Sequence, residues 1–150
     1  MGATRQVVRI LDRWGQAAAI VRNRLHAETE NDVYPFLDVL AGVGGVIAGQ
    51  VVYLTPAETV LPADSGDVGQ AGLVVGLAAD DAAGGEIVRV LAGGIVYRAA
   101  WVLVPGTIYW LGNAGELTDV PPVVGFLQRI GVARAVTVLA IQMGEPVLRV

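Results

Sequence analysis

A short pattern occurs twice in this chain and limits what it can fold into. It appears as "GQVVYLTPAETVLPAD" at residues 49–64 and again as "GTIYWLGNAGELTDVPP" at residues 106–122. Each copy has a glycine, a run of β-forming residues ending in Leu, a turn, a short second run and a proline, which is typical of a β-hairpin. The similarity continues where residues 72–78 align with 126–133, and residues 88–94 align with 136–144. Such self-similarity predicts a duplicated antiparallel β-meander.

The glycines in these copies have distinct expected roles. In "LGNAGEL" we expect a turn between two antiparallel strands, with Asn113 and one or both glycines at positive φ. Gly76 and Gly131 occupy matching places in the two copies. We expect them to allow close backbone approach or a bulge, and not to contact a ligand.

The rest of the chain from Phe36 onward also has the composition of a β protein. Short runs of Val, Ile, Leu and Tyr are separated by turn-forming residues, as in "EIVRVLAGGIVY", "AAWVLV" and "PVLRV". Several runs are apolar at consecutive positions, which is typical of strands covered on both faces. We therefore predict a mainly β fold, a small sandwich or barrel with a body at residues 33–150. Its two similar units are expected at about 46–96 and 103–150.

The first segment, residues 1–32, has a different composition and is expected to form an N-terminal arm. Apolar residues recur there at steps of four and three, which favours one stripe of a helix; they are Val7, Leu11, Trp14, Ala18, Val21 and Leu25. A hairpin of "VVRIL" and "AAAIV" fits the same residues. A third alternative is an extended arm that takes a fixed shape only on a partner.

Composition excludes several classes of function. The chain has no cysteine, which excludes disulfides and thiolate metal sites. A net charge of −4 argues against general binding to nucleic acid. No apolar run is long enough for a membrane-spanning helix, so no membrane partner is expected. Hydrophobic residues make up 54% and charged residues 16% of the chain, and this apolar excess favours burial in an oligomer.

Few residues suggest chemistry, so we expect no enzyme activity, no cofactor and no metal site. The chain has one histidine, His26, and one serine, Ser65, in the turn "PADSGD", which makes a Ser-His-Asp set implausible. Asp64 and Asp67 in that turn lack the ligand spacing of a calcium loop. One group of aromatic residues is expected at a subunit interface or in the core, with a carbohydrate platform as the alternative; it comprises Tyr97, Trp101, Tyr109, Trp110 and Phe126.

The second copy resembles a β module found in many structural proteins of tailed bacteriophages. The matching pieces are Gly106–Leu111, Gly115–Thr118, Pro121–Pro122, Ile130–Ala133 and Val136–Ile141. Such modules occur in tail and head fibres and in capsid decoration proteins, commonly as trimers. A short chain with one arm and a duplicated β body is most similar to the trimeric decoration proteins with a β-tulip body. The resemblance covers about residues 46–150.

This resemblance implies a structural virion protein that binds the outside of a phage capsid as a homotrimer and stabilises it. The expected partners are further copies of the chain and the major capsid protein. Arginine and tryptophan are common interface anchors, so the candidates for capsid contact are in the arm: Arg5, Arg9, Arg13, Trp14, Arg22 and Arg24. The alternative function is a fibre or receptor-binding module that recognises a host glycan.

Overall fold

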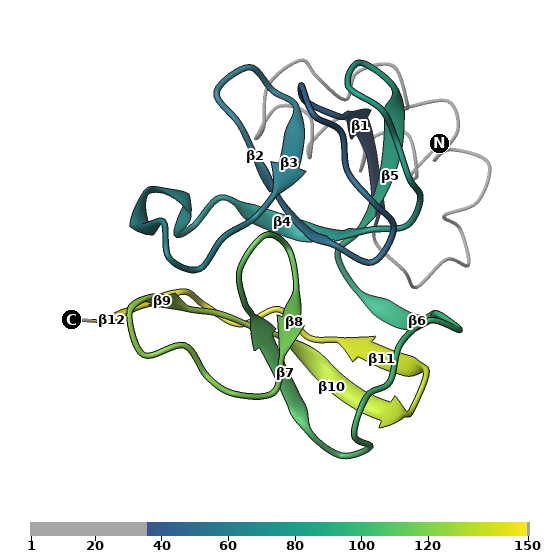
Figure 1. Ribbon diagram of the computed structural model, residues 1–150, viewed down its shortest axis with the longest axis vertical. Helices are drawn as coiled ribbons and strands as arrows, with labels where there is room; N and C mark the ends of the chain where they lie inside the picture. The colour runs from purple at the N-terminus through teal and green to yellow at the C-terminus, as the bar shows by residue number, and fades with distance from the viewer. Residues whose placement is uncertain (1–35, 150) are drawn as a thin grey trace, which may run out of the picture.

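The computed structural model describes residues 36–149, and its regular structure is almost entirely antiparallel β-sheet (Figure 1). The first sheet has the strand order β1-β5-β4-β2-β3. Its strands are β1 (Phe36–Leu40), β2 (Val51–Leu54), β3 (Val60–Pro62), β4 (Val74–Ala78) and β5 (Ile87–Leu91). The predicted conformation and boundary of the N-terminal arm at residues 1–32 lie outside the described residues.

The second sheet repeats the first. Its order is β6-β11-β10-β7-β8, which is the order of the first sheet with each strand replaced by its counterpart. Its strands are β6 (Gly94–Tyr97), β7 (Ile108–Leu111), β8 (Leu117–Thr118), β10 (Arg129–Ala135) and β11 (Val138–Ile141). The mainly β, duplicated and antiparallel fold class is therefore confirmed.

Two details of this order were not expected. In each copy the second strand of the hairpin, β3 or β8, lies at an edge of the sheet. The next strand of that sheet pairs on the far side of the hairpin's first strand, so the strand order is not that of a plain meander. The second copy also carries a two-stranded sheet of β9 (Gly125–Leu127) and β12 (Val147–Arg149). The first copy has a 3₁₀ turn instead, η2 (Val68–Gln70), in which the Gly69 N–H donates to the carboxylate of Asp67.

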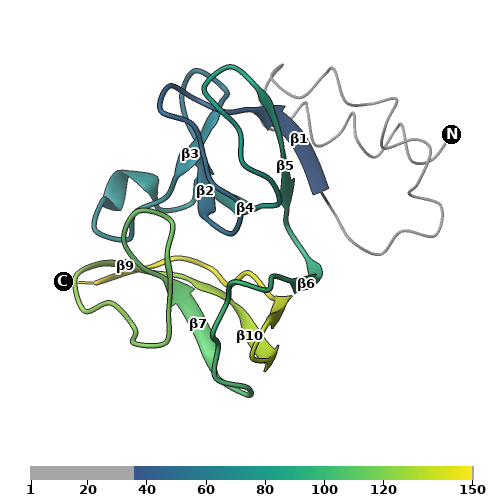
Figure 2. The ribbon, with the colours of Figure 1, turned by 45° about the vertical axis from the view of Figure 1, so that its right-hand side comes forward.

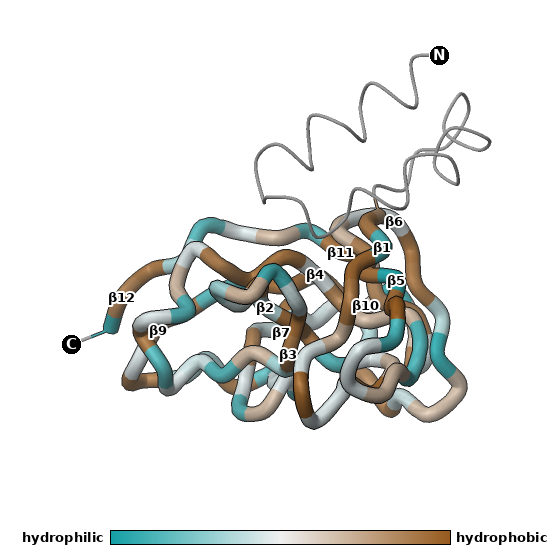
Figure 3. The backbone as a smooth tube through the Cα atoms, turned by 90° about the horizontal axis from the view of Figure 1, so that it is seen from above, coloured by the Kyte–Doolittle hydropathy of each residue, from teal (hydrophilic) through white to brown (hydrophobic). Residues whose placement is uncertain are grey.

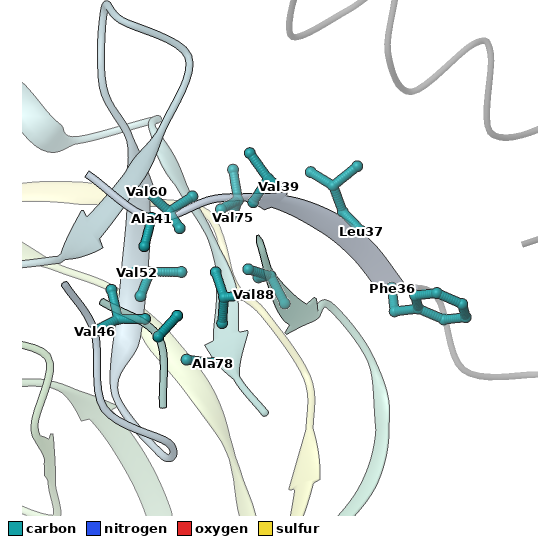
Figure 4. Close-up of a cluster of buried hydrophobic side chains, with 12 residues drawn as sticks. Phe36, Leu37, Val39, Ala41, Val46, Val52, Val60, Val75, Ala78 and Val88 are labelled. Carbon is teal, nitrogen blue, oxygen red and sulfur yellow. The ribbon is translucent and has the colours of Figure 1, made fainter. Parts of the chain in front are cut away.

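The first copy curls into a small closed barrel. Ala41, directly after β1, bridges to Val60 at the start of β3, and the Gly42 N–H donates to the Val60 carbonyl at 2.9 Å. These contacts join the two edges of the sheet. The enclosed side chains are mostly valines, which pack closely on a pleated surface (Figure 4).

A second core joins the two copies. It contains Val51 and Leu77 from the outside of the barrel and, from the second copy, large apolar side chains such as Leu111, Phe126 and Leu139. The second sheet thus packs its inner face against the barrel (Figure 1). Strands of the barrel are covered on both faces, as their consecutive apolar residues predict.

The tip of the β7–β8 hairpin ties the copies together through its backbone. The Val51 N–H donates to the Gly115 carbonyl at 2.8 Å, and the Gly115 N–H donates to the Ala63 carbonyl at 2.6 Å. The Ser65 N–H donates to the Gly112 carbonyl at 3.0 Å. The Gln50 side-chain amide donates to the Ala114 carbonyl at 3.3 Å.

The turn expected in "LGNAGEL" forms, but with a different residue in the left-handed conformation. Ala114 has φ of 53° and Gly115 has φ of 81°, so the expected positive φ at Asn113 was wrong. At Gly115 a side chain would meet Gln50 and the Val51 carbonyl. Contact with the barrel therefore fixes the shape of this turn.

Gly76 and Gly131 have the predicted role of allowing close backbone approach. A Cβ atom at Gly76 would collide with the carbonyl oxygen of Leu91, and one at Gly131 would collide with that of Ala140. Each glycine also lies beside a register shift between its strand and the neighbouring hairpin strand. The sequence match between these glycines therefore reflects the same backbone geometry in both sheets.

Two of the expected strand runs behave differently. "EIVRVLAGGIVY" forms two strands, β5 and β6, which belong to different sheets (Figure 2). The break falls at Ala92 and Gly93, and Gly94, the first residue of β6, has φ of 89°. "AAWVLV" forms no strand, so its prediction as a strand was wrong. Leu103 from that run is buried in the second core instead, and its N–H donates to the Val136 carbonyl.

Candidate interaction surface

The outer face of the second sheet is apolar across four strands. A row of directly paired residues runs from Ile95 on β6 through Ala140 and Val132 to Ile108 on β7. Beside this row, on the same face, lie Tyr97, Val138 and Trp110. We call these seven residues the outer face of the second sheet.

Several side chains of this outer face remain exposed. Tyr97 is 67% exposed and Ile95 is 51% exposed, and Ile108 is also exposed. An antiparallel sheet with one face in water normally carries polar residues on that face. An apolar face of this extent is typical of a surface that another protein segment covers.

The first copy has a matching row of apolar residues, and part of that row is buried within the chain. The matching row runs from Phe36 through Leu91 and Leu77 to Val51. Leu77 and Val51 are fully buried against the second copy. The two copies therefore present equivalent apolar rows, of which the first is covered within the chain.

The two faces differ where the first copy carries charges. Asp38 and Arg89 pair across β1 and β5, with the Arg89 Nε 3.0 Å from an Asp38 carboxylate oxygen. The guanidinium of Arg89 also lies 3.9 Å from the centre of the Phe36 ring. In the second sheet the corresponding pair is Tyr97 and Val138, so this position carries no charge there. A charge lies elsewhere on the second face, where Arg129 pairs with Trp110.

A second group of exposed apolar residues lies at the opposite end of the second copy. It surrounds β9 and β12, where the hydropathy colours of Figure 3 are brown along part of β12. We call this group the valine-rich end; it comprises Val120, Val123, Val124, Val147 and Leu148. A pocket of about 520 Å³ borders it and is also lined by Pro121, Pro122 and Asn113.

The structure separates the five aromatic residues predicted for a subunit interface. Phe126 is 0% exposed and Tyr109 is buried, so both belong to the core of the chain and not to an exposed surface. The Tyr109 hydroxyl accepts a hydrogen bond from the Val104 N–H at 2.9 Å. Tyr97 and the half-buried Trp110 lie on the outer face of the second sheet.

The remaining aromatic candidate, Trp101, lines a different pocket. This pocket of about 420 Å³ lies where the two copies meet, and its polar members include Gln50, Arg98 and Glu116. Trp101 is half-buried and packs against the second core. A tryptophan beside polar groups in a pocket is an arrangement that suits a sugar ring.

In the acidic turn "PADSGD", both aspartate side chains accept hydrogen bonds from nearby backbone N–H groups. An Asp64 carboxylate oxygen accepts from the Gly66 N–H at 2.8 Å, and an Asp67 carboxylate oxygen accepts from the Gly69 N–H at 3.0 Å. Ser65 between them is buried. Within residues 36–149, no group of three or more His, Asp or Glu side chains is placed to hold a metal ion.

Other predicted residues lie outside the part of the chain that the structure describes. These are His26 and all the candidates for capsid contact, namely Arg5, Arg9, Arg13, Trp14, Arg22 and Arg24. Across the described range no helix is long and apolar enough to cross a membrane.

No protein-family model matches the chain, and no curated protein is significantly similar to it.

Sequence reasoning missed most of the outer face. Ile95, Ile108, Val132 and Val138 are ordinary β-forming residues and were assigned no role beyond their strands. The signal was nevertheless present in the alignment of the copies, because Ile108 matches Val51 of the first copy. A repeat position that is buried in one copy and still apolar in the other marks a face that needs a partner.

Proposed function

We propose that this chain is a structural virion protein that binds the exterior of a phage capsid as a homotrimer and stabilises the capsid. The observation that carries the proposal is the apolar outer face of the second sheet, on a duplicated β body that resembles phage structural modules. A face of this kind favours a role in assembly. The major capsid protein is the proposed second partner.

The stabilisation would come from buried apolar area and from multivalency. Burial contributes roughly 25 cal/mol per Å² of apolar surface removed from water. A trimer presents each capsid-binding segment three times on one rigid body. Linked contacts bind more tightly than separate ones because the later contacts form at a high effective concentration.

The N-terminal segment is the proposed capsid-binding part. Its arginines can form planar, two-pronged hydrogen bonds with carboxylates on a partner surface. Trp14 would supply a large apolar contact beside them.

The test is mass spectrometry of intact phage particles purified on a gradient. We expect the chain in amounts stoichiometric with the major capsid protein. If it is absent from particles that contain all other structural proteins, the proposal fails. Removal of the chain from the particles should lower the temperature at which the capsid releases its DNA.

The pocket beside Trp101 supports a second candidate, a fibre module that recognises a host glycan. Arg98, Gln50 and Glu116 provide polar partners for sugar hydroxyls around the indole ring. A fibre protein would be present in only a few copies per particle, at the tail. Binding to a glycan array that Trp101→Ala abolishes would favour this candidate over decoration.

A further inference from the structure

The second sheet has two open edges, whereas the matching edges of the first sheet are joined. In the first copy Ala41 bridges to Val60, and the Gly42 N–H donates to the Val60 carbonyl, so β1 and β3 meet. The counterparts of these strands in the second copy are β6 and β8 (Figure 1). Within the described residues, β6 pairs with β11 alone and β8 pairs with β7 alone. An open edge presents N–H and C=O groups to which another strand can pair.

The open edge of β6 combines free backbone groups with apolar side chains. The Arg98 N–H donates to the Thr137 carbonyl, on the side of β11. Because the backbone groups of an antiparallel strand alternate in direction, those of Tyr97 and Ile95 point to the open side. The side chains of both residues are also exposed. The same two residues therefore offer hydrogen-bonding groups and apolar surface.

The opposite edge of the sheet has the same character at Ile108. β8 has two residues, which pair with Trp110 and Leu111, so β8 ends before it reaches the level of Ile108. The Leu111 N–H donates to the Gln128 carbonyl on the side of β10. The alternation along β7 then directs the backbone groups of Ile108 to the outer side, beyond the end of β8. The Ile108 side chain is exposed as well.

We propose that, in the homotrimer, β6 of each chain pairs edge to edge with β7 of the next chain, with Ile95 opposite Ile108. The two edges differ, so the contact is head to tail, and a three-fold rotation closes it into a ring. The inference rests on the trimer of the proposed function and adds which strands meet.

The register follows from the paired rows of the sheet. Ile95 and Ile108 end the same row, so they lie at the same level along the strands. Rotation about an axis that runs along the strands keeps this level, and it brings Ile95 of one chain beside Ile108 of the next. β6 and β7 run in opposite directions within the sheet, so the new pair is antiparallel. The charged residues that follow β6 and β8, Arg98 and Asp119, have opposite signs and do not repel each other at this contact.

The charges of the outer face favour a contact at its edges over one across its middle. Arg129 and Arg134 both lie on β10, in the middle of the sheet, and Arg134 is exposed. A partner that covered the whole face would bury these guanidinium groups, which is costly without carboxylates beside them. In the middle of the row, Ala140 is already buried and Val132 is half-buried. Contact at the two ends of the row covers the exposed apolar residues and leaves both arginines in water.

Engineered cysteines test this pairing, because the chain contains none of its own. Within one chain, Ile95 and Ile108 are separated by three strand spacings, about 14 Å, whereas a disulfide needs Cα atoms closer than about 7 Å. The full-length double variant Ile95→Cys/Ile108→Cys can therefore bridge only between chains. After mild oxidation we expect covalent trimers on a non-reducing gel.

Hydrogen exchange of the unmodified chain is a second measurement, which does not depend on the folding of a variant. The amide protons of Ile95 and Tyr97 should exchange slowly in the trimer, because pairing with β7 of the next chain protects them. Fast exchange of both amides in a trimer overturns the pairing.

The controls separate this contact from other modes of assembly. Ile95→Cys combined with Val43→Cys should give no bridge, since Val43 is 95% exposed on a loop outside both edges. Equally efficient bridging in this control overturns the register. Each single variant should also give no covalent dimer, because head-to-tail pairing places no residue opposite itself. Dimers of a single variant, or a double variant whose bridging stops at dimers, indicate a two-fold contact and overturn the inference.

The remaining outcomes distinguish this inference from the proposed function. A trimer by light scattering without bridged chains overturns the pairing of β6 with β7 but leaves the trimer standing. A monomer by light scattering overturns both the pairing and the trimer. Bridged trimers of a chain that is absent from purified phage particles support the pairing and overturn the capsid role alone.

Discussion

Residue 131 must be glycine because of the backbone next to it. The Ala140 carbonyl oxygen occupies the space that a Cβ atom at this position would need. The register shift between β10 and β7 at the same place keeps the chain close to β11. The sequence predicted this role correctly, because the two copies keep a glycine at the same point.

Replacing Gly131 with Val should therefore destabilise the fold. We expect a loss of about 1–3 kcal/mol in the free energy of unfolding, through strain and overpacking. Denaturant unfolding followed by circular dichroism measures it. Ala135→Val on the same strand is the control for added methyl groups at a half-buried position. An unchanged midpoint for Gly131→Val would contradict the close approach.

Tyr109 allows a second test at the scale of single residues. Its ring is buried in the core, and its hydroxyl holds the Val104 N–H in the loop before β7. Tyr109→Phe removes only this hydrogen bond and should cost about 1 kcal/mol in stability. Because the ring is not at a surface, the oligomeric mass by light scattering should stay the same. A change of mass with unchanged stability would indicate that Tyr109 is at an interface.

The turn between β7 and β8 shows what the sequence alone could not predict. Asn113 was the natural candidate for positive φ, yet Ala114 and Gly115 adopt it. The reason is tertiary, since the hairpin tip hydrogen-bonds to Val51 and Ala63 of the other copy. Local propensity predicted the turn and the positive φ of Gly115, but it assigned the second such conformation to Asn113 and not to Ala114.

At the scale of elements, the local residue pattern predicts the hairpins and the paired strands, but it does not predict that "AAWVLV" forms no strand. "AAWVLV" is as rich in β-forming residues as its neighbours, but Leu103 is buried in the core between the copies and the run forms no ladder. The strand order shows the same limit. β3 and β8 lie at an edge of each sheet. Their position depends on long-range strand pairing, which the residue pattern of a single strand does not encode.

The barrel of the first copy makes a prediction about the N-terminal segment. Its edges are joined by Ala41 and Val60, which both lie within the described residues. A chain that starts at Asp32 should therefore keep a β-type circular dichroism spectrum and its oligomeric mass, but should no longer bind particles. Alanine replacement of Arg5, Arg9 and Arg13 in the full-length chain should reduce particle binding without affecting folding. If the shortened chain fails to fold, residues before Asp32 belong to the core.

At the scale of the whole molecule, the duplication leaves an imbalance. On the first copy, Val51, Leu77 and Leu91 of the apolar row pack against the second copy, while the equivalent row on the second copy remains on the outside. Exposed apolar side chains also gather at the valine-rich end. The sequence indicated this excess through its composition, but only the paired rows show where on the surface it lies.

The outer face of the second sheet should therefore control assembly. We expect light scattering at micromolar concentration to give three times the chain mass of 15.6 kDa. Ile108→Asp should shift this mass toward the monomer, because a carboxylate there would lose its water on association without gaining a partner. The monomer should still fold, since Ile108 is exposed.

Val43→Asp is the matched control, because it adds the same charge at a fully exposed apolar residue outside this face. It should leave the trimer intact, which separates the effect of position from that of net charge. If both variants remain trimeric, assembly uses another surface, and Val124→Asp at the valine-rich end would identify it. If the unmodified chain is a monomer, the apolar row must meet a different protein, and the capsid itself becomes the first partner to test on this face.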